Sequence, residues 1–151
     1  MVIVAVPSFG QGGLNEFLHP RFGRCDSFTF VTIENNDITS VKSVPNHAAD
    51  AMGGAGIQAA QIIGNHGATD VIVGFLGPNA SQALASLNLN LYQAPQQQIT
   101  VKDAIDLFIQ GKLSRMEGSN VGAHYGMGGG GGGRGYGGGG MGSGRGRRQQ
   151  F

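Results

Sequence analysis

The chain is poor in cysteine, tryptophan and charge. Its 151 residues include one cysteine, no tryptophan and 13% charged residues. A single cysteine excludes an internal disulfide framework and a zinc site of the C-x-x-C type. This cysteine usage is typical of a reducing compartment, so we expect a cytoplasmic protein.

Long apolar runs are also missing. The apolar residues 1–6 lack a basic segment before them and are followed by Pro7, so we expect no signal peptide. No run approaches the roughly 20 apolar residues that a membrane-spanning helix needs. We therefore expect no membrane contact.

Glycine and arginine, by contrast, are concentrated near the C-terminal end. Of the 34 residues from 118 to 151, 17 are glycine and four are arginine, and none is acidic. Such a segment has too little apolar surface to offset the entropy lost on ordering. We predict a folded domain over residues 1–115 and a disordered Gly/Arg-rich tail over residues 116–151.

The first half of the domain has the pattern of three strands. Residues 2–6 are an unbroken apolar run, typical of a strand covered on both faces. Residues 28–33 and 38–44 are rich in β-branched residues and flank the turn sequence Asn35-Asn36-Asp37, which predicts a hairpin.

The second half alternates helices and strands. Helical spacing of apolar residues begins at Ile57, Pro78 opens a second helix, and Thr100 is a suitable N-cap for a third. Buried strands are expected at residues 70–74 and 89–92. The order β-β-β-α-β-α-β-α predicts an α/β fold with a mixed five-stranded sheet flanked by helices.

Two arginines lie beside the single cysteine in the sequence Pro20-Arg21-Phe22-Gly23-Arg24-Cys25. Guanidinium groups are permanent cations with planar donors, and a thiolate is a soft metal ligand. Ligands of open α/β sheets lie outside the carboxyl ends of parallel strands. We therefore expect residues 21–25, 47–56 and 74–79 to surround one cleft, with two helix N-termini directed into it.

Several segments together suggest a known family. The segments are the opening strand, Gly13-Leu14, Arg21-Phe22-Gly23-Arg24, Asn46-His47 with Gly53-Gly54-Ala55-Gly56, residues 67–74, Gly77 and residues 101–113. In this order they resemble the dinitrogenase iron-molybdenum cofactor biosynthesis family, which includes NifX-like proteins and the C-terminal domain of NifB. The resemblance covers residues 1–115 and implies a ribonuclease H-like three-layer fold.

The resemblance implies non-catalytic binding, carriage or assembly of an anionic metal-sulfur cluster. The cluster would contain molybdenum and iron, or molybdenum with another soft metal such as copper. Proteins that assemble or accept the cofactor would be its partners. The predicted cluster-binding residues are Arg21, Arg24, Gly53, Gly54, Gly56 and Gly77, and the predicted metal ligands are Cys25, His47 and Met52.

Each of these residues also has a purely structural interpretation. Cys25 is equally consistent with a small buried apolar residue, because free cysteines are often buried. Arg24 is equally consistent with an ion pair to Asp26. His47 and Met52 are then ordinary loop side chains, and the glycines serve only the turn into a helix.

Two other classes of function remain alternatives. The tail arginines resemble those of RGG-type segments, which bind single-stranded nucleic acid, so the tail predicts a nucleic-acid or protein contact. A hydrolase of the ribonuclease H type needs paired carboxylates for magnesium ions. The first strand contains no carboxylate, and Asp26, Asp50 and Asp70 are scattered, so hydrolysis is the least favoured function.

Overall fold

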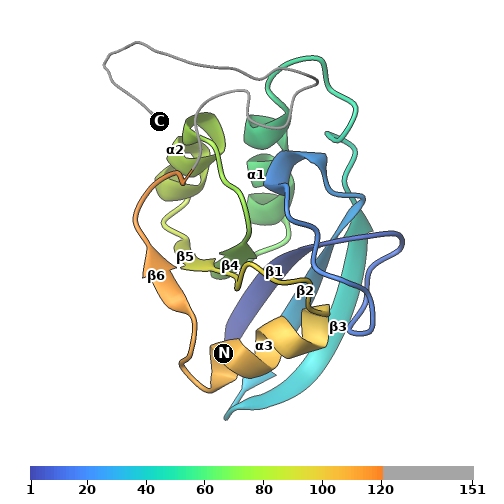
Figure 1. Ribbon diagram of the computed structural model, residues 1–151, viewed down its shortest axis with the longest axis vertical. Coiled ribbons are helices and arrows are strands. Elements are labelled where there is room, and N and C mark those ends of the chain that lie inside the picture. The colour runs from blue at the N-terminus through green and yellow to red at the C-terminus, as the bar shows by residue number, and fades with distance from the viewer. Residues whose placement is uncertain (121–151) are drawn as a thin grey trace. The chain divides into compact units, whose positions relative to one another are not determined.

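The computed structural model describes residues 1–120 and shows a six-stranded mixed sheet with helices on both faces (Figure 1). The sheet order is β3-β2-β1-β4-β5-β6. Residues 121–151, and with them most of the expected tail, lie outside the described residues. The elements are β1 (Val2–Ser8), η1 (Phe22–Arg24), β2 (Ser27–Glu34), β3 (Asp37–Pro45), α1 (Ala55–Asn65), β4 (Asp70–Val73), α2 (Pro78–Ser86), β5 (Asn90–Gln93), α3 (Val101–Ile109) and β6 (Ser114–Met116).

Strand β1 lies in the middle of the sheet, as its apolar sequence predicts. It pairs with β2 in antiparallel and with β4 in parallel orientation. Val4, Ala5 and Val6 are all 0% exposed. Because successive side chains point to opposite faces of a strand, this unbroken apolar run is explained by helices on both faces.

The predicted hairpin is present as β2 and β3. Asn35 and Asn36 connect the strands with φ values of 53° and 67°. Asparagine tolerates this left-handed region better than most residues, and two such residues in succession match the turn that suits twisted antiparallel strands. The turn sequence therefore determines the position of the hairpin.

Helices α1 and α2 pack on one face of the sheet, and α3 packs on the other. Val71 and Val73 belong to the same core cluster as Ala60 and Ile63 of α1 and Leu84 of α2. Ile72, which points the opposite way, belongs to the cluster that α3 completes through Val101, Ala104 and Ile105. These three layers confirm the predicted α/β class, whereas a ribonuclease H-like topology remains a prediction. Over residues 1–120, the structure contains no helix long and apolar enough to cross a membrane.

The prediction of five strands is wrong, because the described chain has a sixth strand. β6 has only three residues, two of them polar, so it lacks the length and alternation by which a strand is recognised. Its pairing with β5 is supported by Arg115, whose Nη2 donates to Asn90 Oδ1 at 2.7 Å. The Arg115 guanidinium also lies 6.0 Å from the centre of the Tyr92 ring.

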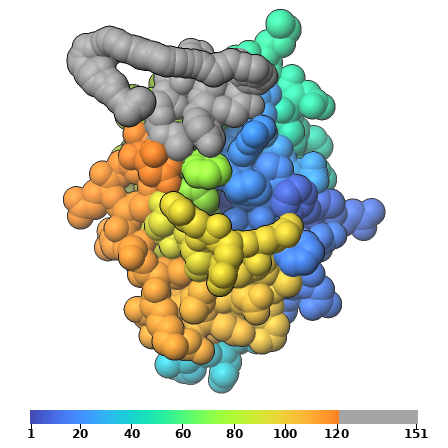
Figure 2. Space-filling model, in the orientation of Figure 1, coloured from blue at the N-terminus to red at the C-terminus, as the bar shows by residue number. Residues whose placement is uncertain are grey.

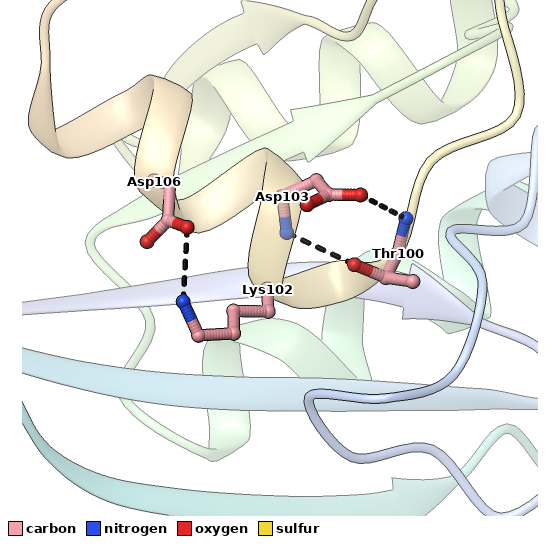
Figure 3. A network of polar contacts seen from close by, with 4 residues as sticks. All are labelled: Thr100, Lys102, Asp103 and Asp106. Atoms are coloured by element: carbon pink, nitrogen blue, oxygen red, sulfur yellow. Dashed lines mark hydrogen bonds and ion pairs between the residues drawn. The ribbon is translucent and has the colours of Figure 1, made fainter.

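Helix α3 begins with a complete capping box (Figure 3). The Asp103 N–H donates to Thr100 Oγ1 at 3.1 Å, and the Thr100 N–H donates to Asp103 Oδ2 at 3.2 Å. Both bonds satisfy amides that a helix start otherwise leaves without an acceptor. Lys102, in the same first turn, forms an exposed ion pair with Asp106, one turn later, with 3.0 Å between Nζ and Oδ2.

Replacing Thr100 tests how much this cap stabilises the protein. We expect Thr100→Ala to lower the free energy of unfolding by about 1 kcal/mol, because one amide loses its acceptor. The control is Lys102→Ala, which removes an exposed ion pair and should cost less than about 0.5 kcal/mol. Urea unfolding followed by circular dichroism measures both, and equal losses in the two variants would contradict this role of Thr100.

Candidate functional site

The predicted site segments come together at one edge of the sheet. β1 and β4 are parallel and end at this edge, β3 also ends there, and β2 begins there, because Ser8 pairs with Ser27 and Ser27 with Pro45. The edge therefore collects η1 with its flanking residues, the segment 46–54, and the segment 74–77. Segments 21–25, 47–56 and 74–79 thus lie at one edge, as predicted, while the cleft between them stays a prediction.

Helix α1 lies very close to η1 on one side and to α2 on the other, with a glycine at each contact. A Cβ atom on Gly23 would lie 3.1 Å from Gly56 N, and a Cβ atom on Gly56 would lie 2.9 Å from Ala80 Cβ. Both distances are shorter than normal van der Waals contacts. Gly23 thus allows α1 to lie against η1, and Gly56 allows α1 to lie against α2.

Arg24 joins η1 to the segment 46–54. Its Nη1 donates to the carbonyl oxygens of Ala49 at 2.7 Å and Ala51 at 2.8 Å. The alternative partner, Asp26, instead accepts a hydrogen bond from the Gly10 N–H at 2.8 Å. The half-buried guanidinium of Arg24 therefore holds the loop that leads into α1, and its positive charge stays at this edge.

Asn46, which is not among the predicted site residues, makes a second connection between the same segments. Its Nδ2 donates to Gly23 O at 3.2 Å and to Cys25 O at 3.0 Å, while its Oδ1 accepts from the Ala48 N–H at 3.1 Å. An asparagine that directly follows Pro45 at the end of a strand is a turn signal. That signal predicts the local turn, but not the contact with residues 23–25, which are distant in sequence.

Cys25 is a core residue, which agrees with its structural interpretation, whereas its role as a thiolate ligand stays a prediction. Its side chain is 0% exposed, and its thiol donates to Phe22 O at 3.4 Å. Burial raises the pKa of the Cys25 thiol to about 12, because the thiolate would be poorly solvated there. The thiol is therefore protonated at neutral pH, and the structural interpretation applies.

His47 and Met52 do not form a ligand set with Cys25. Met52 is 94% exposed and His47 is also exposed, whereas Cys25 is buried. Within residues 1–120, no group of three or more His, Cys, Asp or Glu side chains is placed to hold a metal ion. The predicted ligands thus differ in burial, although His47 and Met52 share the segment between β3 and α1.

Arg21 is exposed at the start of η1, beside the segment that follows β4. It forms an isolated parallel bridge with Phe75, whose N–H donates to Pro20 O at 2.7 Å. In Figure 2 the green surface of the segment after β4 borders the blue surface of residues near η1. Arg21 therefore lies close to the start of α2, which follows directly on this segment.

The starts of α1 and α2 have no side-chain cap. Their N-cap residues are Gly54, with φ 72°, and Gly77, and neither helix has an acidic residue in its first turn. At the start of α3, by contrast, the Thr100 side chain accepts a hydrogen bond from the Asp103 N–H, and the Asp103 side chain accepts one from the Thr100 N–H. The first-turn amides of α1 and α2 thus provide partial positive charge near Arg21 and Arg24.

Gly53, the remaining predicted residue, is exposed, and a Cβ atom built on it meets no other atom. Space around this position leaves the backbone before α1 open to a ligand. Uncapped helix starts, two guanidiniums and open backbone together form an edge with the chemistry of an anion site.

Comparisons with known proteins identify the family. The chain belongs to the family described as dinitrogenase iron-molybdenum cofactor, which matches residues 1–111. Membership associates it with binding or biosynthesis of this cofactor. An uncharacterized protein of Methanocaldococcus jannaschii is 36% identical over 103 residues, which cover 68% of this chain and 86% of that protein.

Solved structures agree with this assignment. The apo form of the orange protein from Desulfovibrio gigas is 32% identical, with a TM-score of 0.73, and the match covers 80% of this chain and 98% of that one. A putative NifB protein from Thermotoga is 31% identical with a TM-score of 0.64, over 76% of this chain and 93% of that one.

The burial of Cys25 leads to a direct test with a thiol reagent. Because this is the single cysteine, alkylation by iodoacetamide reports on one site. We expect labelling of the native protein at pH 8 to be roughly a hundredfold slower than in denaturant, since the reactive thiolate is rare and buried. Mass spectrometry measures the rate, and similar rates with and without denaturant would show that Cys25 is accessible.

Proposed function

We propose that the protein binds a preassembled anionic metal-sulfur cluster and carries it, without catalysis, between proteins that assemble or accept it. The observation that supports this most strongly is the pair of uncapped helix starts, α1 and α2, beside Arg21 and Arg24. Backbone amides and guanidinium groups both favour anions. Membership in the cofactor family supplies the class of anion.

The donor set favours a cluster that keeps its own sulfide ligands. A protein-ligated iron-sulfur cluster ordinarily needs about four thiolates. This chain has one cysteine, and its thiol is buried and protonated. A sulfide-coordinated anion of molybdenum with iron or copper would instead be held by charge and by hydrogen bonds to its sulfides.

In this proposal the predicted residues have different roles. Arg21 is exposed and would contact the cluster directly, whereas Arg24 would act mainly by holding the loop before α1. Gly54 and Gly77 would present the first-turn amides of their helices, with Gly56 allowing the two helices to approach. His47 and Met52 remain candidate soft ligands, because exposed side chains are accessible to a bound cluster.

Hydrolysis is less well supported because Asp26, Asp50 and Asp70 do not converge, and no group of three such side chains among residues 1–120 is placed to hold a metal ion. Asp26 precedes β2 at the site edge, whereas Asp70 opens β4 at the opposite end and pairs with Val4. Asp70 accepts hydrogen bonds from Thr69 and Asn90. Paired metal ions need carboxylates that converge on one point, so this arrangement favours carriage over phosphodiester chemistry.

A charge-removal experiment tests the proposed site. We expect the full chain to bind tetrathiomolybdate, alone or with copper(I), with a change in its charge-transfer absorption. Arg21→Ala should weaken binding roughly tenfold, as expected for the loss of one charged contact. Arg115→Ala is the matched control, since Arg115 is also exposed but lies on β6, and it should leave the affinity unchanged.

A tail variant separates this proposal from its alternative, a nucleic-acid or protein contact through the tail. Replacing Arg134, Arg145, Arg147 and Arg148, which lie outside the described residues, by glutamine removes the positive charge of the tail. If the tail binds nucleic acid, this variant loses retention of single-stranded RNA and keeps its affinity for thiomolybdate. Equal affinities for Arg21→Ala and Arg115→Ala would contradict the proposed site.

A further inference from the structure

The imidazole of His19 lies between the end of β1 and Arg21. The backbone N–H of Arg21 donates to His19 Nδ1 at 3.0 Å. The backbone N–H of His19 donates to Pro7 O at 2.8 Å. The His19 ring also packs on the Phe9 ring, with 4.3 Å between centroids and 37° between planes. The side chain of His19 is thus fixed by an aromatic contact and accepts a hydrogen bond from the arginine assigned to the cluster.

We propose that neutral His19 positions Arg21 for anion binding, and that protonation of His19 releases the Arg21 backbone and weakens cluster binding at acidic pH. The effect on cluster binding rests on the proposed function. The effect on the Arg21 backbone does not, because it follows from the hydrogen bond alone. His19 is therefore a positioning residue that makes the site sensitive to pH.

The chemistry of imidazole explains the switch. A neutral imidazole can accept at Nδ1 only when its single ring proton is on Nε2. Protonation places a proton on Nδ1 as well, so that two N–H groups face each other where one hydrogen bond existed. The Arg21 amide then loses its acceptor, and a second cation appears beside the Arg21 guanidinium.

The charges around His19 favour its neutral form near pH 7. Burial lowers the pKa of His19 from its ordinary value of 6.5, and the positive charge of Arg21 lowers it further. Asp26, which precedes β2, acts in the opposite direction. Because the net shift is downward, His19 accepts from Arg21 at neutral pH. This contact is lost only as the pH falls through the lowered pKa of His19.

The other side of the Arg21 segment is held by Phe75. The Phe22 N–H donates to Phe75 O at 3.4 Å, and the Phe75 N–H donates to Pro20 O at 2.7 Å. These backbone contacts involve no titrating group. Protonation of His19 therefore changes the position of Arg21 locally and leaves the sheet intact.

NMR spectroscopy of the full chain tests the switch without any ligand. We expect nitrogen shifts of His19 that report an unprotonated Nδ1 at pH 7.5. We also expect amide exchange of Arg21, corrected for intrinsic rates, to be about fivefold faster at pH 5.5. In His19→Asn the amide oxygen replaces Nδ1 as an acceptor that does not titrate, so protection of Arg21 should be retained at both pH values.

Two further variants complete the comparison. His19→Ala should lose protection of the Arg21 amide at both pH values, because no acceptor remains. His66→Asn is the matched control: the ring of His66 stacks on Phe30 and its Nδ1 contacts Ile62 O in α1, so the response of Arg21 to pH should persist. A wild-type Arg21 amide whose corrected exchange rate is the same at pH 7.5 and 5.5 would overturn the proposal.

Binding of tetrathiomolybdate at the two pH values then tests the functional consequence. We expect wild-type affinity to fall at least threefold from pH 7.5 to 5.5, and the affinity of His19→Asn to change less. Equal pH dependence in the two proteins would overturn the role of His19 in binding. If wild-type protein binds no thiomolybdate at either pH, the proposed function fails, while the NMR result still decides whether His19 controls the Arg21 backbone.

Discussion

The close approach of Gly23, Gly56 and Ala80 is the constraint on which the edge of the sheet depends. It brings η1 against the first turn of α1, and the first turn of α1 against α2. Arg24 and Asn46 then connect η1 to the loop before α1 through backbone carbonyl and amide groups. A Cβ atom at Gly56 would require α1 and α2 to shift, and a Cβ atom at Gly23 would require a shift of a few tenths of an ångström between η1 and α1.

The three helix starts show how the fold distributes charge. The start of α3 is neutralised by its own capping box on one face of the sheet, whereas α1 and α2 begin at glycines on the other face. An anion beside α1 and α2 would therefore meet backbone amides without competition from a carboxylate in either first turn. Such a surface fits the proposed carriage of a cluster, because many weak contacts release a bound anion more readily than thiolate bonds do.

Local chemistry explains which parts of the structure could be predicted from the sequence. Asn35-Asn36 and Thr100 act within a few residues, and they gave the hairpin and the start of α3 correctly. β6 was not predicted, because the hydrogen bond that supports its pairing joins Arg115 to Asn90, 25 residues earlier in the sequence. The roles of Arg24 and Cys25 likewise depend on burial and on partners supplied by the segment 46–51, which the residue types alone do not reveal. The sequence thus predicted which segments lie together at this edge, but not which of their residues hold the loops.

The most direct test of the anion site is amide chemical-shift mapping with tetrathiomolybdate on the full chain. We expect the largest changes at residues 54–57 and at residues 79 and 80, in the first turns of α1 and α2. The amides of Val101, Lys102 and Asp103 serve as an internal control, because the start of α3 is already capped. Changes confined to α3 or to residues beyond 120, with none in the first turns of α1 and α2, would contradict binding at this edge.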